Sequence, residues 1–405
     1  MIPPQEKLLP EVNIGMVGHV DHGKTTLTTA LTGKWTSTHS EELKRGITIR
    51  LGYADATFYR CPKEGAYGTS KACPECSSEC EIVRTVSFVD APGHETLMAT
   101  VLAGAALMDG ALLIISANEA CPQPQTREHL TALEIVGIKN IVIAQTKIDL
   151  VTEEQALKNH DEIKAFLKGS IAENAPIIPV SAQQNVNIGA LIGAIEKRIT
   201  TPNRDLSKPP IMYIARSFDV NKPGTAIESL KGGVIGGALV EGALKIGDAA
   251  EIRPGIKVKD SFEPVTVKVT GIRQAGMDLQ EARPGGLLGI STEMDPYFTK
   301  SDALSGSILG LKDKLPPVLH QLTFTASLLE RVIGSKEELT VAPIKAGDVL
   351  MLAVGPNRTV GSVSSPGKKV TVSLKMPVCA GKGQRVAISR QVAGRWRLIG
   401  WGEIV

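Results

Sequence analysis

The sequence predicts an α/β domain with a mostly parallel sheet, followed by two antiparallel β-barrel domains. From residue 12 to about residue 200, nearly continuous apolar runs of strand length alternate with helical patterns, which is typical of a parallel sheet with helices on both faces. Beyond residue 210 the helical patterns stop and short alternating segments lie between glycines, as in β-barrels. A chain of 405 residues that is 42% apolar is long enough for several such cores.

The expected elements of the first domain follow from these patterns. The strands are predicted at 12–17, 85–90, 110–116, 140–145 and 177–180. The helices are predicted at 95–107, 125–136, 153–167 and 188–199. Thr152, followed three residues later by Gln155, predicts a capping box at the start of the third helix.

The domain boundaries are predicted from proline-rich breaks. Three prolines in 201–210 indicate a linker, and Pro316-Pro317 indicates a second boundary. The predicted division is a flexible N-terminus at 1–10, an α/β domain at 11–200 with a cysteine-bearing insert at 58–82, the linker at 201–210, and barrels at 211–317 and 318–405. The predicted barrel strands are 211–218, 233–240, 249–253, 265–272 and 287–291 in the first, and 321–326, 349–354, 369–375 and 384–390 in the second.

The composition of the chain says more about its cellular compartment than about its binding partners. Lys and Arg total 45 against 42 Asp and Glu, so net charge predicts no nucleic-acid partner by itself. Residues 1–13 lack the apolar core of a signal peptide, and no run reaches the about 18 to 20 apolar residues of a membrane span. Four of the six cysteines fall within 61–80, which favours a reducing compartment with one local metal site over a disulfide framework. We expect a cytoplasmic protein.

The stretch GHVDHGKT at 18–25 predicts a phosphate-binding loop between a strand and a helix. Gly18 and Gly23 allow backbone N–H groups to turn toward phosphate oxygens, and the following helix presents its positive end to the same anion. Lys24 can reach the β- and γ-phosphates, and the Thr25 hydroxyl can ligate Mg²⁺. A plain glycine turn is the alternative, which the complete GxxxxGKT pattern disfavours. The other nucleotide contacts that we expect here are Val20, Asp21, His22 and Thr26, with the backbone rather than the imidazoles carrying most of the binding.

A second segment, DAPGH at 90–94, predicts recognition of the γ-phosphate. Asp90 ends a strand beside the loop and is placed to hold a Mg²⁺-bound water, although a helix N-cap is the alternative for this residue taken alone. Gly93 offers a backbone N–H that can meet a γ-phosphate, a contact present with a triphosphate and absent with a diphosphate. Thr48, in RGITI at 45–49, is the predicted second hydroxyl ligand of Mg²⁺.

The segment QTKID at 145–149 predicts the choice of base. The Asp149 carboxylate can accept from N1–H and the exocyclic amine of guanine, and leaving a buried carboxylate unpaired would penalise adenine. The stem of Lys147 can lie over the purine. Ser181-Ala182, followed by Gln183, can offer a backbone N–H to the guanine carbonyl, although a strand-end serine is more often a cap. GTP and GDP are therefore the predicted ligands.

GHVDHGKT, RGITI, DAPGH, TKID and SA occur in an order and spacing that resembles the translational GTPases related to elongation factor Tu. Within them, the cysteine-bearing insert and the segments 231–237 and 388–402 resemble the gamma subunits of archaeal and eukaryotic translation initiation factor two. The resemblance covers about residue 11 to residue 405. It implies a guanine-nucleotide domain followed by two β-barrels.

The resemblance also implies a function. Such a factor carries methionylated initiator tRNA to the small ribosomal subunit with GTP bound, in a heterotrimer whose alpha subunit docks on the first barrel and whose beta subunit docks on helices of the nucleotide domain. Slow GTP hydrolysis then acts as the release switch. The alternatives are an elongation factor of the same architecture, either general or selenocysteine-specific, and a nucleotide-gated assembly scaffold. The tRNA preference tests the first alternative, and hydrolysis after His94→Ala tests the second.

The resemblance further implies roles at the γ-phosphate. His94 matches the residue that orients the attacking water, and Val20 and Ile47 match the apolar gate around it. Lys24, Mg²⁺ and the loop amides would stabilise the negative charge that develops in the transition state. A second magnesium would lie near Asp21 and the carbonyl of Gly46.

Two departures from the family pattern accompany the resemblance. Thr146 stands where most relatives have Asn, and its hydroxyl has less donor and acceptor capacity than an amide, which predicts weaker guanine affinity without altered specificity. Cys73 and Cys76 form a CxxC pair, but the other half begins at Cys61 and lacks its second cysteine. We therefore predict Zn²⁺ bound by Cys61, Cys73, Cys76 and Cys80; the alternative is a degenerate knuckle with reduced cysteines and no metal.

Overall fold

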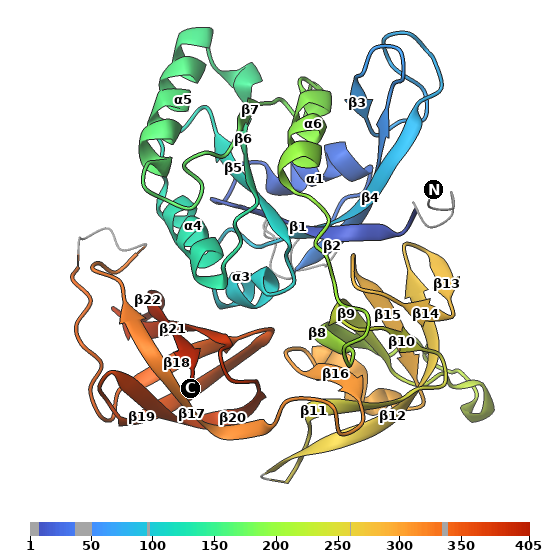
Figure 1. Ribbon diagram of the computed structural model, residues 1–405, viewed down its shortest axis with the longest axis vertical. Helices are drawn as coiled ribbons and strands as arrows, with labels where there is room; N and C mark the ends of the chain where they lie inside the picture. Colours follow the sequence, from blue (N-terminus) through green and yellow to red (C-terminus); the bar gives the residue numbers. More distant parts are fainter. Residues whose placement is uncertain (1–7, 37–50, 95–97, 260, 334–338) are drawn as a thin grey trace. The chain divides into compact units, whose positions relative to one another are not determined.

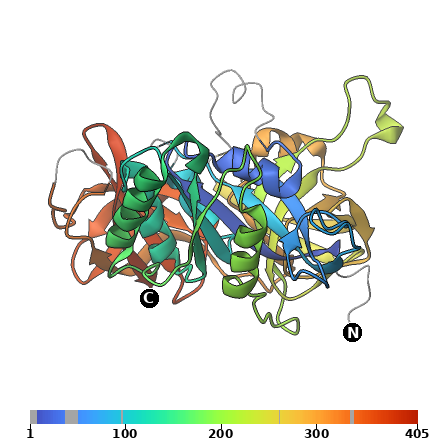
Figure 2. The same cartoon turned by 90° about the horizontal axis from the view of Figure 1, so that it is seen from above.

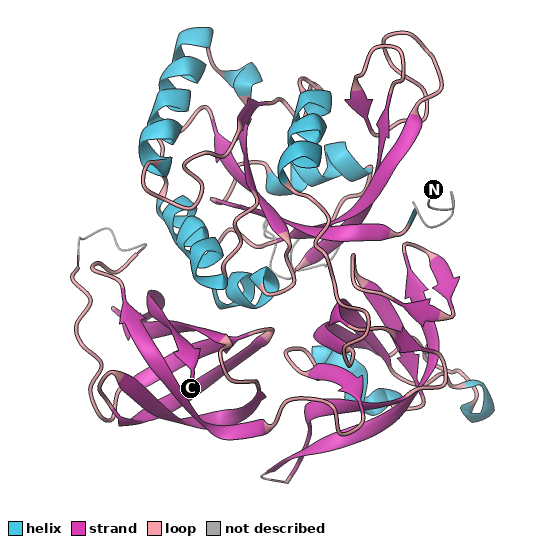
Figure 3. Cartoon of the chain, in the orientation of Figure 1, coloured by secondary structure: helices cyan, strands magenta, loops and turns pink. Residues whose placement is uncertain are grey.

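The structure is a computed structural model that describes residues 8–36, 51–94, 98–259, 261–333 and 339–405. The chain forms two compact units, one built from the chain up to Pro202 and the other from nearly all of the chain after it. Longer helices occur in the first unit, whereas the second consists mainly of strands and loops (Figure 3). In the described part of the chain, no helix combines the length and apolarity needed to cross a membrane.

The first unit contains a seven-stranded sheet within the described residues, in the order β3-β2-β4-β1-β5-β6-β7. Strands β1, β4, β5, β6 and β7 are parallel, and β2 and β3 are antiparallel additions at one edge. The strand bounds are β1 Pro10–Gly18, β2 Gly52–Arg60, β3 Tyr67–Gly68, β4 Glu81–Asp90, β5 Gly110–Ser116, β6 Ile141–Thr146 and β7 Ile177–Pro179. The predicted mostly parallel sheet is confirmed. Sequence patterning missed β2, whose half-buried residues alternate between apolar and polar.

Helices cover both faces of this sheet (Figure 1). Helices α1 (Lys24–Thr32) and α6 (Ile188–Arg198) share one buried core with β1, in which Met16, Leu27 and Ile192 take part. The other face carries α3 (Met98–Ala105), α4 (Pro124–Val136) and α5 (Glu153–Leu167). The predicted capping box at α5 is confirmed, because Thr152 and Gln155 bond to each other's backbone N–H groups. The first predicted helix, at 95–107, corresponds to α3, and its predicted start at 95–97 lies outside the described residues.

The second unit contains two barrels, as predicted. The first has the order β11-β16-β8-β9-β15-β12, which closes through pairing of β11 with β12, and the second is a closed barrel of order β17-β20-β19-β18-β21-β22. The strands of the first part are β8 Ile211–Phe218, β9 Val234–Glu241, β10 Leu244–Lys245, β11 Ala249–Val258, β12 Ser261–Gln274, β13 Met277–Leu279, β14 Glu281–Ala282, β15 Leu288–Thr292 and β16 Ile308–Leu311, with short helical turns at Ile227–Ser229 and Pro296–Asp302. Those of the second are β17 Val318–Leu328, β18 Val349–Val354, β19 Asn357–Ser365, β20 Lys369–Cys379, β21 Arg385–Val392 and β22 Arg395–Ile404.

The connection between the barrels is fixed by hydrogen bonds from both sides. Arg253 of the first barrel donates to the carbonyls of Leu315 and Pro316, each at 3.0 Å, and pairs with Glu251 at 2.9 Å. The Cys379 thiol of the second barrel donates to the same Pro316 carbonyl at 2.9 Å. Arginines on barrels are commonly solvated, but this guanidinium is largely enclosed and structural.

Candidate functional site

The loop between β1 and α1 has the backbone conformation that a phosphate-binding loop requires. Gly18, Asp21 and Gly23 have φ values of 146°, 60° and 87°. Positive φ is readily adopted by glycine and turns successive N–H groups toward one side of the loop. Gly23 directly precedes α1, so the unpaired N–H groups of the first helical turn face the same region.

Lys24 lies inside this loop. Its Nζ donates to the carbonyls of Gly18 at 3.0 Å and His19 at 2.6 Å. Burial lowers the pKa of Lys24 to about 8, because removal from water disfavours the charged form. A phosphate beside the ammonium would oppose that shift. Two carbonyls of the phosphate loop therefore hold the Lys24 side chain in position.

Asp90 reaches the loop because β4 lies beside β1, with Met16 opposite Asp90. The carboxylate is fully buried, and its Oδ2 accepts hydrogen bonds from Thr25 at 2.9 Å and from Thr36 at 2.6 Å. A hydroxyl next to a carboxylate is an oxygen donor set that suits Mg²⁺. Thr36 was not anticipated from the sequence. The predicted residues Gly46, Ile47 and Thr48 lie outside the described residues.

Gly93 lies directly against the loop. A side-chain carbon at this position would overlap Lys24 Nζ and lie 3.0 Å from the Val20 nitrogen and 3.1 Å from the Gly18 oxygen. A side chain at this position would require Lys24 and the loop backbone to shift, so glycine permits the close approach. His94 is the next residue in the chain and is partly buried. It therefore directly follows the glycine that contacts the phosphate loop.

The predicted base-recognition segment starts at the end of β6 and touches the same loop. The Thr146 hydroxyl donates to the carbonyl of His22 at 2.7 Å, so it retains a bridge to the phosphate loop. Lys147 has a φ of 59°, and the 3-10 turn Ile148–Leu150 carries Asp149, which is exposed rather than buried. A base bound against this segment would shield the Asp149 carboxylate from water.

Ser181 is brought beside this segment by the backbone. The Val180 N–H donates to the Gln145 carbonyl at 2.7 Å, and Ser181 pairs with Val186 across a short turn. Ser181 is buried, Ala182 is half-buried and Gln183 is exposed. The Ser181 hydroxyl accepts a hydrogen bond of 3.2 Å from the Gln184 N–H, which is the local cap expected of a strand-end serine. Hydrogen bonds to a base would therefore come from the neighbouring backbone.

His129 belongs to the site, although its sequence context suggested no role in chemistry. From α4, its Nδ1 accepts a hydrogen bond of 2.7 Å from the Gly18 N–H. Burial lowers the pKa of His129 to about 3, so the ring is neutral and carries its proton on Nε2. No spacing pattern could reveal this contact, because 111 residues separate the two partners.

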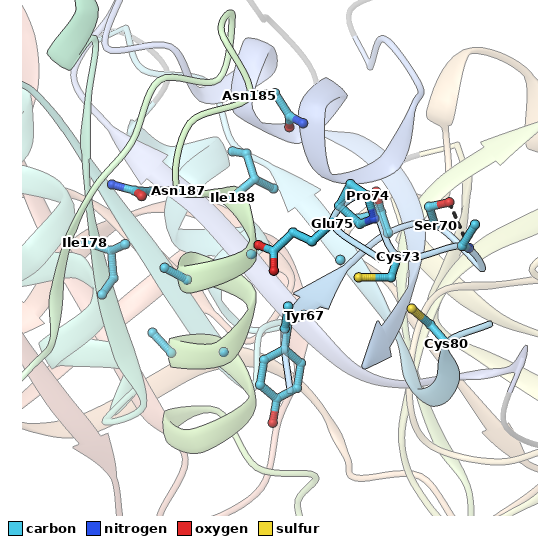
Figure 4. A pocket seen from close by; sticks show the side chains of 18 of the residues that line it. Tyr67, Ser70, Cys73, Pro74, Glu75, Cys80, Ile178, Asn185, Asn187 and Ile188 are labelled. Carbon is cyan, nitrogen blue, oxygen red and sulfur yellow. Dashed lines mark hydrogen bonds between the residues drawn. The ribbon is translucent and has the colours of Figure 1, made fainter. Parts of the chain in front are cut away.

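The four predicted cysteine ligands gather in the insert between β2 and β4. The sulfurs of Cys61, Cys73 and Cys80 lie within 4.8 Å of one another, and Cys61 Sγ is 3.6 Å from Cys76 Sγ. Thiolates around one tetrahedral zinc lie about 3.8 Å apart, given a Zn–S distance of about 2.3 Å. Cys73 and Cys80 lie next to each other in Figure 4. The cluster could hold a metal.

The electrostatics of the cluster differ among its thiols. Hydrogen bonds with Ser78 lower the pKa of Cys76 to about 7, so its thiolate is accessible near neutral pH. Burial and the nearby Cys61 raise the pKa of Cys80. A bound cation would favour all thiolates, since metals take the deprotonated form.

The insert is anchored on α6, and both views show the two side by side (Figure 1 and Figure 2). Between them is a groove of about 1220 Å³ lined by both segments. A side-chain carbon at Gly193 would lie 3.2 Å from the Tyr67 ring, and one at Gly189 would crowd the Tyr67 carbonyl. Small residues on α6 therefore let β3 pack closely and fix the insert on the nucleotide unit.

Family models match two parts of the chain. Residues 9–201 match the model described as "Elongation factor Tu GTP binding domain", and residues 320–404 match "Initiation factor eIF2 gamma, C terminal". The chain is 59% identical over 399 residues to translation initiation factor 2 subunit gamma of Methanocaldococcus jannaschii and, equally, of Pyrococcus horikoshii. Each comparison covers 97% of both sequences.

Solved structures of related architecture give the same picture of the fold. A bacterial selenocysteine-specific elongation factor, EF-Sec, superposes with a TM-score of 0.75 at 26% identity, covering 98% of this chain and 58% of the other. The elongation factor SelB of Methanococcus maripaludis, in complex with the GTP analogue GppNHp, has a TM-score of 0.73 at 22% identity. That match covers 98% of this chain and 79% of SelB, and it supports the fold alone.

Proposed function

The chain belongs to the gamma subunits of translation initiation factor 2, among the translational GTPases with an elongation factor Tu-type domain, and on this premise we propose a GTP-dependent carrier of methionylated initiator tRNA to the small ribosomal subunit. The observation that carries the proposal is 59% identity over 97% of both chains. The elongation-factor alternative is supported less, by 26% identity over 58% of EF-Sec.

The nucleotide is GTP or GDP with Mg²⁺ in this proposal. Thr25 would ligate the metal, Thr48 would add a second hydroxyl, and Asp90 would hold a metal-bound water. The shared contact of Thr25 with the buried Asp90 supports this arrangement. Asp21 and the Gly46 carbonyl would hold a second magnesium. The loop 18–26 and the Gly93 N–H would bind the phosphates.

Guanine would be selected at the ends of β6 and β7. Asp149 would accept two hydrogen bonds from the base, Lys147 would cover its face, and the backbone at Ser181, Ala182 and Gln183 would meet its carbonyl. The backbone hydrogen bond from Val180 to Gln145 supports this, because it holds the two segments together. Thr146 would maintain the link from base to phosphate loop through His22.

Hydrolysis would be slow and would act as a switch. His94 would orient the attacking water between Val20 and Ile47, while Lys24 and the loop amides would stabilise the developing charge. The proximity of Gly93 to Lys24 and Val20 supports this placement, since His94 is the next residue. Loss of the γ-phosphate would remove the Gly93 contact and release tRNA.

Zinc is the metal that we assign to the cysteine cluster. Soft thiolates favour Zn²⁺ over oxygen-preferring cations. The mutual proximity of the Cys61, Cys73 and Cys80 sulfurs and the 3.6 Å between the Cys61 and Cys76 sulfurs support a structural site formed by these four residues, which would fix the insert against α6.

The partners in this proposal are alpha and beta subunits, initiator tRNA and the small ribosomal subunit, in the cytoplasm. The alpha subunit would dock on the first barrel and the beta subunit on helices of the nucleotide domain. The domains would be 11–200, 211–317 and 318–405, joined by 201–210, after an N-terminal 1–10. The separate closed barrels support this division, although β1 already begins at Pro10.

The test is tRNA binding by the complex with alpha and beta subunits. We expect methionylated initiator tRNA to bind at least tenfold more tightly with GTP than with GDP, and in preference to elongator methionyl-tRNA. Equal binding of both tRNAs would support the elongation-factor alternative. Equal binding with GTP and GDP would contradict the switch.

A further inference from the structure

Asn159 is a polar residue on the buried stripe of α5. The buried residues of this helix are Asn159, Ile163 and Leu167, which share one face of the helix. An apolar side chain would suit such a position, and burying an amide costs free energy unless its polar atoms are hydrogen-bonded. The contacts of the Asn159 amide therefore indicate why this position is polar.

The Asn159 amide contacts the ends of two neighbouring strands. Its Oδ1 accepts a hydrogen bond of 2.9 Å from Gln145 Nε2, near the end of β6. Its Nδ2 donates to the carbonyl of Glu119 at 2.8 Å and to that of Ser116, the last residue of β5, at 3.5 Å. Gln145 Nε2 also donates to the Ala156 carbonyl at 2.8 Å. Gln145 and Asn159 are both buried, so the hydrogen bond between them is shielded from water.

These hydrogen bonds close the loop at 147–152, which connects β6 to α5 and carries Lys147 and Asp149. Gln145 lies just before the loop, and Asn159 lies in the second turn of the helix that follows it. Within the loop, Lys147 has a φ of 59°, an uncommon conformation for a residue with a side chain, which persists where the surroundings hold it. The side chain of Gln145 thus ties the start of the loop to the helix at its end.

We propose that Asn159 is a positioning residue for base recognition, which holds the loop at 147–152 in the conformation in which Asp149 meets guanine. The inference rests on the proposed selection of guanine by Asp149. Asp149 is exposed, so the backbone of the loop, rather than packing of its own side chain, sets its direction. A loop that is held in place before the base binds pays less ordering entropy on binding, and it keeps the carboxylate aligned with both donors of guanine.

The experiment compares the binding of GDP and of inosine diphosphate (IDP) to the full chain with Mg²⁺, by calorimetry. IDP lacks the exocyclic amine of guanine and so loses one hydrogen bond to Asp149. The wild type should therefore prefer GDP over IDP by roughly tenfold or more. Asn159→Leu, which has a side chain of similar shape without the amide, should lower this preference by roughly threefold or more, because Asp149 is no longer held against the base.

Ile163→Ala is the matched control. Ile163 lies one turn further along α5, is fully buried and has an apolar side chain. Its truncation weakens the packing of α5 without removing a hydrogen bond to β6, so the preference for GDP should keep its wild-type value. An equal fall in Ile163→Ala would overturn the inference, because weaker packing of α5 would then be sufficient to explain it.

Gln145→Leu removes the same hydrogen bond from the other partner, and it provides an independent variant if Asn159→Leu does not fold. It should lower the preference for GDP by a similar factor. The double variant should show about the same preference as either single variant, because both changes break one connection. A preference that falls by the product of the two single factors would overturn the inference.

The wild type tests the proposed function separately. Equal binding of GDP and IDP by the wild type would contradict the selection of guanine by Asp149, and the role of Asn159 with it. A wild-type preference for GDP that stays unchanged in Asn159→Leu and Gln145→Leu would overturn only the role of Asn159.

Discussion

The backbone N–H of Gly18 donates a hydrogen bond of 2.7 Å to Nδ1 of His129. This hydrogen bond ties the first glycine of the phosphate loop to α4, a helix on the face of the sheet opposite to α1. The bond requires an unprotonated Nδ1, so the loop depends on a neutral imidazole.

This dependence predicts acid sensitivity. The pKa of His129 is lowered from 6.5 to about 3, so the unfolded chain takes up a proton below about pH 6.5 that the folded chain refuses. Stability from this residue is complete above about pH 6.5 and is lost as the pH falls toward 3, by about 2 kcal/mol at pH 5. His129→Asn, whose amide oxygen can accept from Gly18, should lose that part of the acid sensitivity in denaturant unfolding at pH 7 and pH 5.

The matched control is His160→Asn, on the partly exposed side of α5. It should retain the wild-type difference between the two pH values. Identical pH dependence in His129→Asn and wild type would contradict a neutral buried imidazole.

Replacing Thr146 with Asn should increase the affinity for GDP. Its hydroxyl maintains the bridge to the His22 carbonyl, but an Asn side chain can serve the loop and a base together. Thr146→Asn should bind GDP roughly three- to tenfold more tightly, and Thr146→Val should bind it more weakly, as measured by calorimetry. No gain in Thr146→Asn would sink the idea that Thr146 limits affinity.

Zinc content tests the cysteine cluster. The wild type should contain one equivalent by elemental analysis, and Cys80→Ser should lose most of it because three thiolates remain. Cys121→Ser, outside the cluster, is the control and should keep the full equivalent. A full equivalent in Cys80→Ser would show that Cys80 is not a ligand.

His94→Ala tests the hydrolytic role. Single-turnover GTP hydrolysis on small ribosomal subunits should slow by roughly 10²- to 10⁴-fold, the usual effect of losing a group that handles the water. GTP affinity should remain near the wild-type value, since the phosphates are held by the loop. Equal rates in variant and wild type would favour the scaffold alternative.

Sequence patterning predicted those parts of the site that are set by topology. Asp90 and Thr146 end parallel strands on either side of β1, and the carboxyl ends of such strands share one edge of the sheet. The contacts of His129 and Thr36 could not be predicted in this way, because packing of distant segments brings each to its partner. In the barrels, β16, β19 and β22 were missed, since β16 has only four residues and serine, glycine and arginine interrupt the alternation of β19 and β22.

Arg84 of β4 sets a limit on how the chain can be shortened. Its buried guanidinium donates to Glu196 at 2.8 Å, to the Ile199 carbonyl at 2.6 Å and to the Thr201 hydroxyl at 3.2 Å, and Thr201 in turn donates to Glu11 at 2.8 Å. A truncation that ends before Ile199 would leave a buried cation with lost acceptors, which is costly in a protein interior. An isolated nucleotide-binding fragment should therefore extend through Thr201, three residues beyond the last turn of α6.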